Sequence, residues 1–97
     1  MAKRFPALAI IAASAFFISG ASTALAADPG FCRSYAQAAI NQVRGALSNP
    51  ACVGGVQGNR WSSDFQVHYE WCLGASFTAT GAERDARTRM LRQCAGR

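Results

Sequence analysis

The chain has 97 residues, of which 51% are hydrophobic and 15% are charged, and its formal net charge at pH 7 is +5. A chain of this length forms one domain at most, and a core of that size is marginally stable without disulfides or a metal. The chain has four cysteines but a single histidine, so it lacks the several histidines that many metal sites use.

Residues 1–26 have the three-part pattern of a secretory signal peptide: basic residues, a short apolar run and small residues at the end. We expect cleavage after Ala26, with Ala27 as the near alternative, which leaves a mature domain of residues 27–97. The rival interpretation is an uncleaved membrane anchor, because about 20 apolar residues span a bilayer. Serine, glycine and threonine interrupt the run, however, and no basic cluster follows it. We therefore expect a periplasmic or secreted protein with no stable membrane span after cleavage.

All four cysteines lie in the predicted mature domain: Cys32, Cys52, Cys72 and Cys94. An even number of cysteines in a short exported chain is typical of a disulfide framework. None of them forms a C-x-x-C pair, which excludes a thioredoxin-type motif, the usual zinc-knuckle spacing and covalent haem attachment. The sequence predicts two disulfides, no metal and no other cofactor.

The first predicted helix begins after Asp28, a suitable N-cap residue, and has Pro29 in its first position. The pair Asn49-Pro50 ends it. Between these signals, apolar residues recur at steps of three and four and occupy one side of a helical wheel. This periodicity is the strongest structural signal in the chain.

Residues 53–61 contain three glycines and have no helical or strand periodicity, so they predict a loop. Their spacing fits neither common phosphate-binding glycine motif, and no strand precedes them. We expect these glycines to allow positive φ angles in a tight crossing.

A second predicted helix begins at a capping box formed by Ser63 and Gln66, and it runs to about Leu73 with Gly74 as its stop. On a helical wheel only Gln66 and Glu70 form a polar side. Because the helix is apolar around most of its circumference, we expect it to be buried between neighbouring helices.

Asp64, His68 and Cys72 are spaced four residues apart and share one face of this helix, as half of a metal site would. Three facts weigh against such a site: the expected disulfide at Cys72, the lack of a second histidine, and the position of Asp64 in the first helical turn. We expect His68 to be a hydrogen-bonded core histidine. Trp61 and Trp71 are expected in the core, with one of them partly exposed.

A third predicted helix begins at a capping box formed by Thr80 and Glu83 and runs to about Ala95. We expect Glu83 to pair with Arg87, and Asp85 with Arg89, one helical turn apart. Its apolar stripe is thin and consists of Ala82, Ala86, Met90 and Cys94, with Leu91 at the margin.

Residues 83–97 hold five arginines and two acidic residues, while loss of the signal peptide lowers the net charge from +5 to +3. The mature charge is therefore concentrated on this helix. It forms either a solvated face or a patch that attracts anionic lipid, polysaccharide or an acidic protein. Nucleic acid is not an expected partner, because no aromatic residue lies among these arginines to stack on bases. The candidate binding surface consists of Arg84, Arg89, Arg92, Trp61 and His68.

Helix length limits how the cysteines can pair. Cys32 and Cys52 flank the first helix and would lie about 25 Å apart, whereas the Cα atoms of a disulfide lie within about 7 Å of each other. Cys72 and Cys94 are separated similarly by the third helix, so two connectivities remain. In an up-down-up arrangement the first and third helices run parallel, which disfavours Cys32–Cys94. We therefore expect Cys32–Cys72 and Cys52–Cys94.

Two spaced patterns, C-x2-Y-A from Cys32 and R-W-x2-D-x3-H-x2-W-C from Arg60, resemble a pattern in small exported bacterial proteins with no assigned function. The resemblance covers most of the mature domain. It implies export and a cysteine-bridged helical domain, and it carries over no activity and no catalytic residue.

We expect an all-α fold, a small three-helix domain stapled by two disulfides after the signal peptide. No Ser-His-Asp set, carboxylate pair in a cleft or metal cluster is evident, so we do not expect an enzyme. The expected function is a binding or structural module of the envelope that acts through protein contacts. The alternative is a cationic factor that binds anionic lipid or polysaccharide surfaces through the arginine-rich C-terminal helix. The sequence indicates neither the specific partner nor the oligomeric state.

Overall fold

The computed structural model describes residues 28–96, which form an all-α domain without strands. The predicted signal peptide, residues 1–26, lies outside the described residues. The elements are α2 (Pro29–Leu47), α3 (Pro50–Val53), the 3-10 turn η2 (Asn59–Trp61), α4 (Phe65–Leu73) and α5 (Phe77–Ala95). The three predicted helices correspond to α2, α4 and α5, and the short helix α3 was not predicted.

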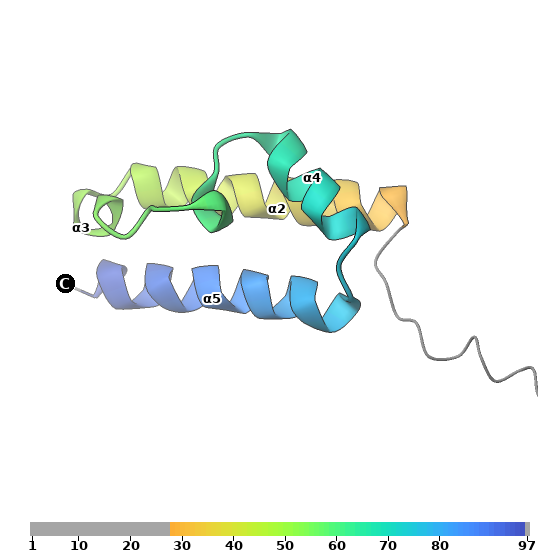
Figure 1. Cartoon of the computed structure of the whole chain (residues 1–97). Coiled ribbons are helices and arrows are strands. Elements are labelled where there is room, and N and C mark those ends of the chain that lie inside the picture. The colour runs from red at the N-terminus through yellow and green to blue at the C-terminus, as the bar shows by residue number, and fades with distance from the viewer. Residues whose placement is uncertain (1–27, 97) are drawn as a thin grey trace, which may run out of the picture.

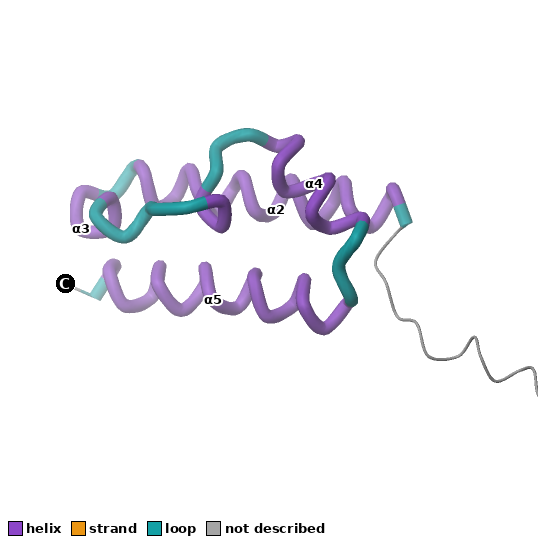
Figure 2. Tube along the Cα trace, in the orientation of Figure 1, coloured by secondary structure: helices purple, strands orange, loops and turns teal. Residues whose placement is uncertain are grey.

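Figure 1 shows α2 and α5 side by side and running in the same direction, with the C-terminal end of α5 near α3. After α3 the chain runs back along α2 through η2 and α4 before α5 begins. The helix α4 packs on α2. Figure 2 shows loops on both sides of the helical turn η2 between α3 and α4, and a loop between α4 and α5. The predicted up-down-up order is therefore correct.

The start of α2 is capped as the sequence predicts. The Asp28 carboxylate accepts a hydrogen bond from the backbone N–H of Phe31 at 3.1 Å, and Pro29 occupies the first helical position. The helix buries one side, which consists of Cys32, Tyr35, Ala36, Ala39, Ile40, Val43 and Ala46. This is the face that the apolar periodicity predicts.

Both predicted capping boxes are wrong. The N-cap of α4 is Asp64 rather than Ser63, and its carboxylate accepts from the backbone N–H of Gln66 at 2.9 Å. The N-cap of α5 is Ser76, so this helix begins about one turn before the predicted start at Thr80. Thr80 is 2% exposed and its hydroxyl donates to the Phe77 carbonyl. In each case another polar side chain satisfies the free N–H groups of the first turn.

The predicted loop over residues 53–61 is only partly a loop, because α3 ends at Val53 and η2 begins at Asn59. The expected positive φ occurs at Gly58, where φ is 80°. The other two glycines of this segment do not adopt it, so only Gly58 owes its place to this backbone conformation.

The predicted disulfide connectivity is confirmed. Cys32 is bonded to Cys72 with a Cα–Cα distance of 5.6 Å, and Cys52 is bonded to Cys94 with a distance of 5.1 Å. The first bond ties α4 to α2, and the second ties the end of α5 to α3. Two such bonds are consistent with an oxidising compartment.

Two apolar clusters lie toward opposite ends of α2, each built around one disulfide. The Trp61 cluster consists of Val43, Ala46, Cys52, Trp61 and Cys94. The Tyr35 cluster consists of Cys32, Tyr35 and Cys72. Within residues 28–96, no helix has the length and apolar character needed to cross a membrane.

The expectation that α4 is buried between neighbours is wrong. Only His68 and Cys72 are buried on this helix, and Phe65 is half-buried against Tyr69, with ring centroids 6.1 Å apart. The reason is that α4 packs mainly on α2 and η2, so its outer side faces solvent.

Candidate functional site

The apolar stripe predicted for α5 is correct only in its C-terminal part, where Cys94 is buried and Met90 and Leu91 pack against the Trp61 cluster. The fully buried residues of this helix are Thr80, Arg87 and Cys94, whereas Ala82 is exposed. These three residues are spaced seven apart, so they share one face of the helix. This face of α5 is buried because Cys94 forms a disulfide and because Arg87 has polar partners on α2. A search for apolar side chains alone does not identify it.

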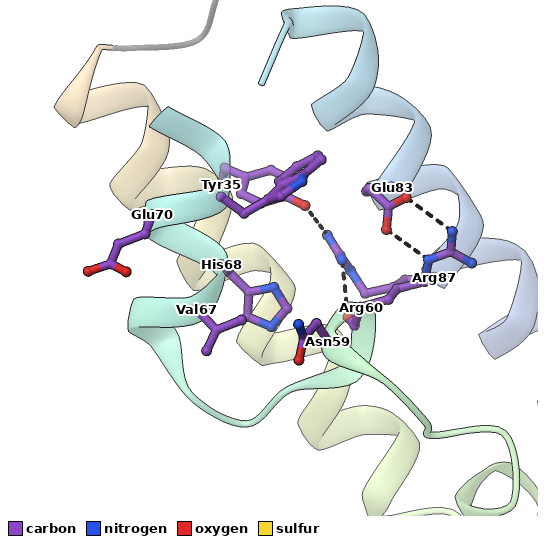
Figure 3. A pocket seen from close by; sticks show the side chains of 9 residues that line it. Tyr35, Asn59, Arg60, Val67, His68, Glu70, Glu83 and Arg87 are labelled. Carbon is purple, nitrogen blue, oxygen red and sulfur yellow. Dashed lines mark hydrogen bonds and ion pairs between the residues drawn. The ribbon is translucent and has the colours of Figure 1, made fainter. Parts of the chain in front are cut away.

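Arg87 is 1% exposed and joins three elements. Its Nε donates to the Gln42 side-chain oxygen on α2 at 2.7 Å, and its Nη1 donates to the Arg60 carbonyl in η2 at 3.2 Å. Its Nη2 donates to the Tyr35 hydroxyl at 3.2 Å, and the guanidinium carbon lies 5.4 Å from the Tyr35 ring centroid. Figure 3 shows the Tyr35 hydroxyl directed at the guanidinium. The interface of α2 with α5 is therefore polar at its centre.

The predicted pair of Glu83 with Arg87 is wrong. Glu83 instead accepts two hydrogen bonds from Arg60, at 2.8 Å from Nε and 3.0 Å from Nη2. These bonds lower the pKa of Glu83 and raise the pKa of Arg60. Among the described residues, Asp85 forms its ion pair with Arg84 rather than with the predicted Arg89. Glu83 pairs across helices because the buried Arg87 side chain is directed toward α2.

These groups line a central cleft of about 630 Å³. Its lining residues come from α2, η2, α4 and α5, and they are Tyr35, Asn59, Arg60, Val67, His68, Glu70, Trp71, Glu83 and Arg87. Tyr35 and Arg87 also line a smaller hollow of about 160 Å³. Tyr35 and Arg87 therefore contribute to the walls of both cavities.

One wall of the central cleft is aromatic. The rings of Tyr35 and Trp71 lie 5.7 Å apart with an interplanar angle of 36°. Trp71 is 42% exposed, whereas Trp61 is 7% exposed and lies in the other cluster. The expectation that one tryptophan stays partly exposed is met by Trp71, because α4 covers α2 and nothing within residues 28–96 covers the outer side of α4 fully.

His68 is buried, at 3% exposed, and its Nε2 lies 2.8 Å from the Ser62 carbonyl oxygen. A carbonyl only accepts hydrogen bonds, so Nε2 carries a proton. The expectation of a hydrogen-bonded, packed histidine is confirmed. Figure 3 shows the ring extending from α4 into the space that it shares with Arg87. Within the described part of the chain, no three His, Cys, Asp or Glu side chains are placed to hold a metal.

The five residues of the predicted binding surface do not come together. Arg84, Arg89 and Arg92 are exposed on α5, whereas Trp61 is in the interior and His68 lines the central cleft. Sequence reasoning missed Tyr35, Arg60, Glu83 and Arg87 as lining residues. The sequence feature that could have indicated the burial of Arg87 is its spacing of seven residues from Cys94, which places both on one face of the helix.

The described groups of the cleft include an aromatic pair whose tryptophan is half exposed, a buried guanidinium and an ion pair between η2 and α5. Such groups are suited to binding, since they supply apolar area and directed hydrogen bonds. A comparison with known protein families, with curated proteins and with solved structures finds no match to this chain.

Proposed function

We propose that the protein is a small exported binding module of the bacterial envelope, periplasmic or secreted, that acts through protein contacts. It holds a segment of a partner protein in the central cleft. The observation that carries this proposal is the half-exposed Trp71 packed against the buried Tyr35 ring beside Arg87. Tryptophan, tyrosine and arginine are the residues that most often dominate binding energy at protein interfaces.

The two disulfides support this proposal because they make the cleft rigid. Cys72 follows Trp71 directly and ties α4 to α2, while Cys94 ties α5 to the segment after α2. A cleft whose walls are linked covalently loses little conformational entropy when a partner binds. The volume of about 630 Å³ also falls in the usual range of binding pockets.

Site-specific photo-cross-linking tests the proposal. A photoreactive phenylalanine replaces Asn59, which is exposed and lines the cleft, and the matched control carries it at Gln37, which is exposed on α2 outside the cleft. We expect a discrete adduct with one envelope protein from position 59 and none from position 37. The adduct should disappear when Trp71→Ala is added. Equal labelling from both positions, or no adduct from either, contradicts the proposal.

Export is tested by intact mass. The protein recovered from the periplasm or medium should begin at residue 27, or at residue 28 if cleavage follows Ala27. A full-length species found in the membrane fraction contradicts export with cleavage.

A charge-driven function is the second candidate, and the exposure of Arg89 and Arg92 favours it. Neither forms an ion pair with another residue of the described range 28–96. Binding to vesicles of anionic lipid through this face should weaken steeply between low and physiological salt. Binding in the central cleft should depend less on salt, because Tyr35 and Arg87 in its wall are buried.

A further inference from the structure

The inner end of the central cleft has more hydrogen-bond donors than acceptors. The Arg87 guanidinium has five N–H groups, and three of them donate to Gln42, Arg60 and Tyr35. The other two have no acceptor within residues 28–96. The Tyr35 hydroxyl accepts from Arg87, and its own proton also lacks an acceptor in that range. Both side chains are more than nine-tenths buried, at 1% and 7% exposed.

Within residues 28–96 no carboxylate accepts a hydrogen bond from Arg87, and the charge of Glu83 acts on it only through space. The three acceptors of Arg87 are neutral, and Glu83, the acidic residue of the cleft on the same helix, pairs with Arg60. A buried charge that shares its nearest counter-charge with another residue, as Arg87 shares Glu83 with Arg60, is only partly compensated. Hydrogen bonds from a guanidinium to an anionic acceptor are among the strongest in proteins. An anionic group at this position would therefore gain both charge and hydrogen-bond complementarity.

The remaining charges of the lining favour an acceptor with a single negative charge. Arg60, Glu70 and Glu83 also line the cleft. Because Arg60 and Glu83 pair with each other, Glu70 is the charge left over, and it would repel a doubly charged phosphate more than a carboxylate. A carboxylate has one charge and two oxygens, which matches one guanidinium and one adjacent hydroxyl.

We propose that the central cleft recognises a carboxylate on the partner's segment, which accepts hydrogen bonds from Arg87 and from the Tyr35 hydroxyl. An apolar side chain next to that carboxylate packs on the exposed ring of Trp71. The carboxylate comes from a chain terminus or from an acidic side chain. This inference rests on the proposed function, since it names the chemistry that the same cleft selects.

Titration by NMR with N-acetyl-phenylalanine and with its neutral amide tests the proposal on the exported, oxidised protein. The Trp71 indole N–H resonance reports on the cleft, and the Trp61 indole N–H in the other cluster is the internal control. We expect the carboxylate form to bind about tenfold more tightly than the amide, the effect of hydrogen bonds to a charged group. The Trp61 resonance should not shift.

Tyr35→Phe is the variant of choice, because it removes the hydroxyl and keeps the ring that fills the Tyr35 cluster. It should weaken binding of the carboxylate form about tenfold and leave the amide unchanged. Tyr69→Phe is the matched control, since this half-buried tyrosine of α4 does not line the cleft. Arg87→Lys keeps the charge but loses the paired N–H geometry, and it should also weaken carboxylate binding.

Equal binding of the amide, of N-acetyl-phenylalanine and of a probe with a side-chain carboxylate would overturn the carboxylate proposal and leave the cleft as a binding site. Absence of binding by all three probes would also overturn it, while cross-linking from position 59 decides the proposed function independently. The third probe, N-acetyl-aspartyl-phenylalaninamide, carries its carboxylate on a side chain. If either acid binds more tightly than the neutral amide, the proposal holds, and the tighter of the two identifies the source of the carboxylate.

Discussion

Each end of α2 lies in an apolar cluster that contains one disulfide, but the side chains of the two clusters are buried to different extents. In the Trp61 cluster the indole is 7% exposed, and Val43 and Cys94 are each 1% exposed. Around the Tyr35 cluster, Trp71 and Phe77 remain 42% and 48% exposed. We call the Trp61 end the closed end because its aromatic ring is buried, although Leu47 and Val53 nearby are exposed. The other end, the open end, presents aromatic side chains to solvent.

The difference shows that a disulfide holds helices together without deciding how completely they bury their side chains. At the closed end, η2 inserts Trp61 between α2 and α5, which fills the space beside the disulfide. At the open end, α4 covers α2, and the hydrogen bonds of Arg87 keep α5 in place. Stability is therefore expected to depend more on the closed end, and binding on the open end.

Removal of each disulfide in turn should give the largest effect and tests directly whether the two ends differ in their contribution to stability. The bonds close loops of similar length, with sequence separations of 40 and 42 residues, so the chain-entropy contribution is about 4 kcal/mol for each. The double substitution of Cys52 and Cys94 with Ala should cost more than that of Cys32 and Cys72, because it also disturbs the filled Trp61 cluster. Urea unfolding measures both losses. A larger loss at the open end would reverse the assignment of the two ends.

Substitution of the two tryptophans sharpens the comparison at the level of single side chains. Trp61→Ala should lower the free energy of unfolding by about 3 kcal/mol, as large-to-small changes in a core do. Trp71→Ala should cost less than about 1 kcal/mol, since that ring is 42% exposed. Thermal melts of the pair provide the measurement. Similar losses in both variants would show that the two clusters are equally closed.

His68 tests whether the open end is built for packing or for metal binding. His68→Gln should destabilise the fold by about 1 kcal/mol, because the amide can still donate to the Ser62 carbonyl. A zinc titration of the unmodified protein should show no stoichiometric binding. Stoichiometric zinc binding that is lost in His68→Gln, with melting unchanged, would contradict the packing role.

The pair of Arg60 with Glu83 should give the smallest effect. The pKa of Glu83 in the folded protein is lowered from its ordinary value of 4.5 by the hydrogen bonds from Arg60. Glu83 therefore binds its proton more tightly in the unfolded chain than in the folded protein. The pair stabilises the folded state at pH values above the ordinary pKa of Glu83. This contribution is lost as the pH falls through the lowered folded-state pKa.

The magnitude of this effect is below about 1 kcal/mol, because the two side chains are 47% and 28% exposed. Glu83→Gln should remove the corresponding part of the stability change between pH 5 and more acidic values, which denaturation at several pH values can measure. An unchanged pH profile in this variant would indicate that the pair does not contribute to stability in solution.

The sequence predicted the features that depend on neighbouring residues and on helix length. Asp28 and Pro29 begin α2 as expected, because N-capping involves groups within one turn. The pairing of Cys32 with Cys72 followed from helix length and helix order together. Helix length excluded a Cys32–Cys52 bond, and the parallel direction of the first and third helices disfavoured Cys32–Cys94. These inferences needed no knowledge of how side chains meet across the domain.

Tertiary structure alone decided the centre of the molecule. Arg87 is 45 residues from Gln42 and 52 from Tyr35 in the sequence, and periodicity assigns such a residue to the solvent side because its charge is costly to bury. Its burial becomes favourable only when those acceptors are brought around it. The cleft, the partner of Glu83 and the exposure of Trp71 follow from the same packing of α4 and α5 on α2, because each depends on which surfaces the other helices leave uncovered.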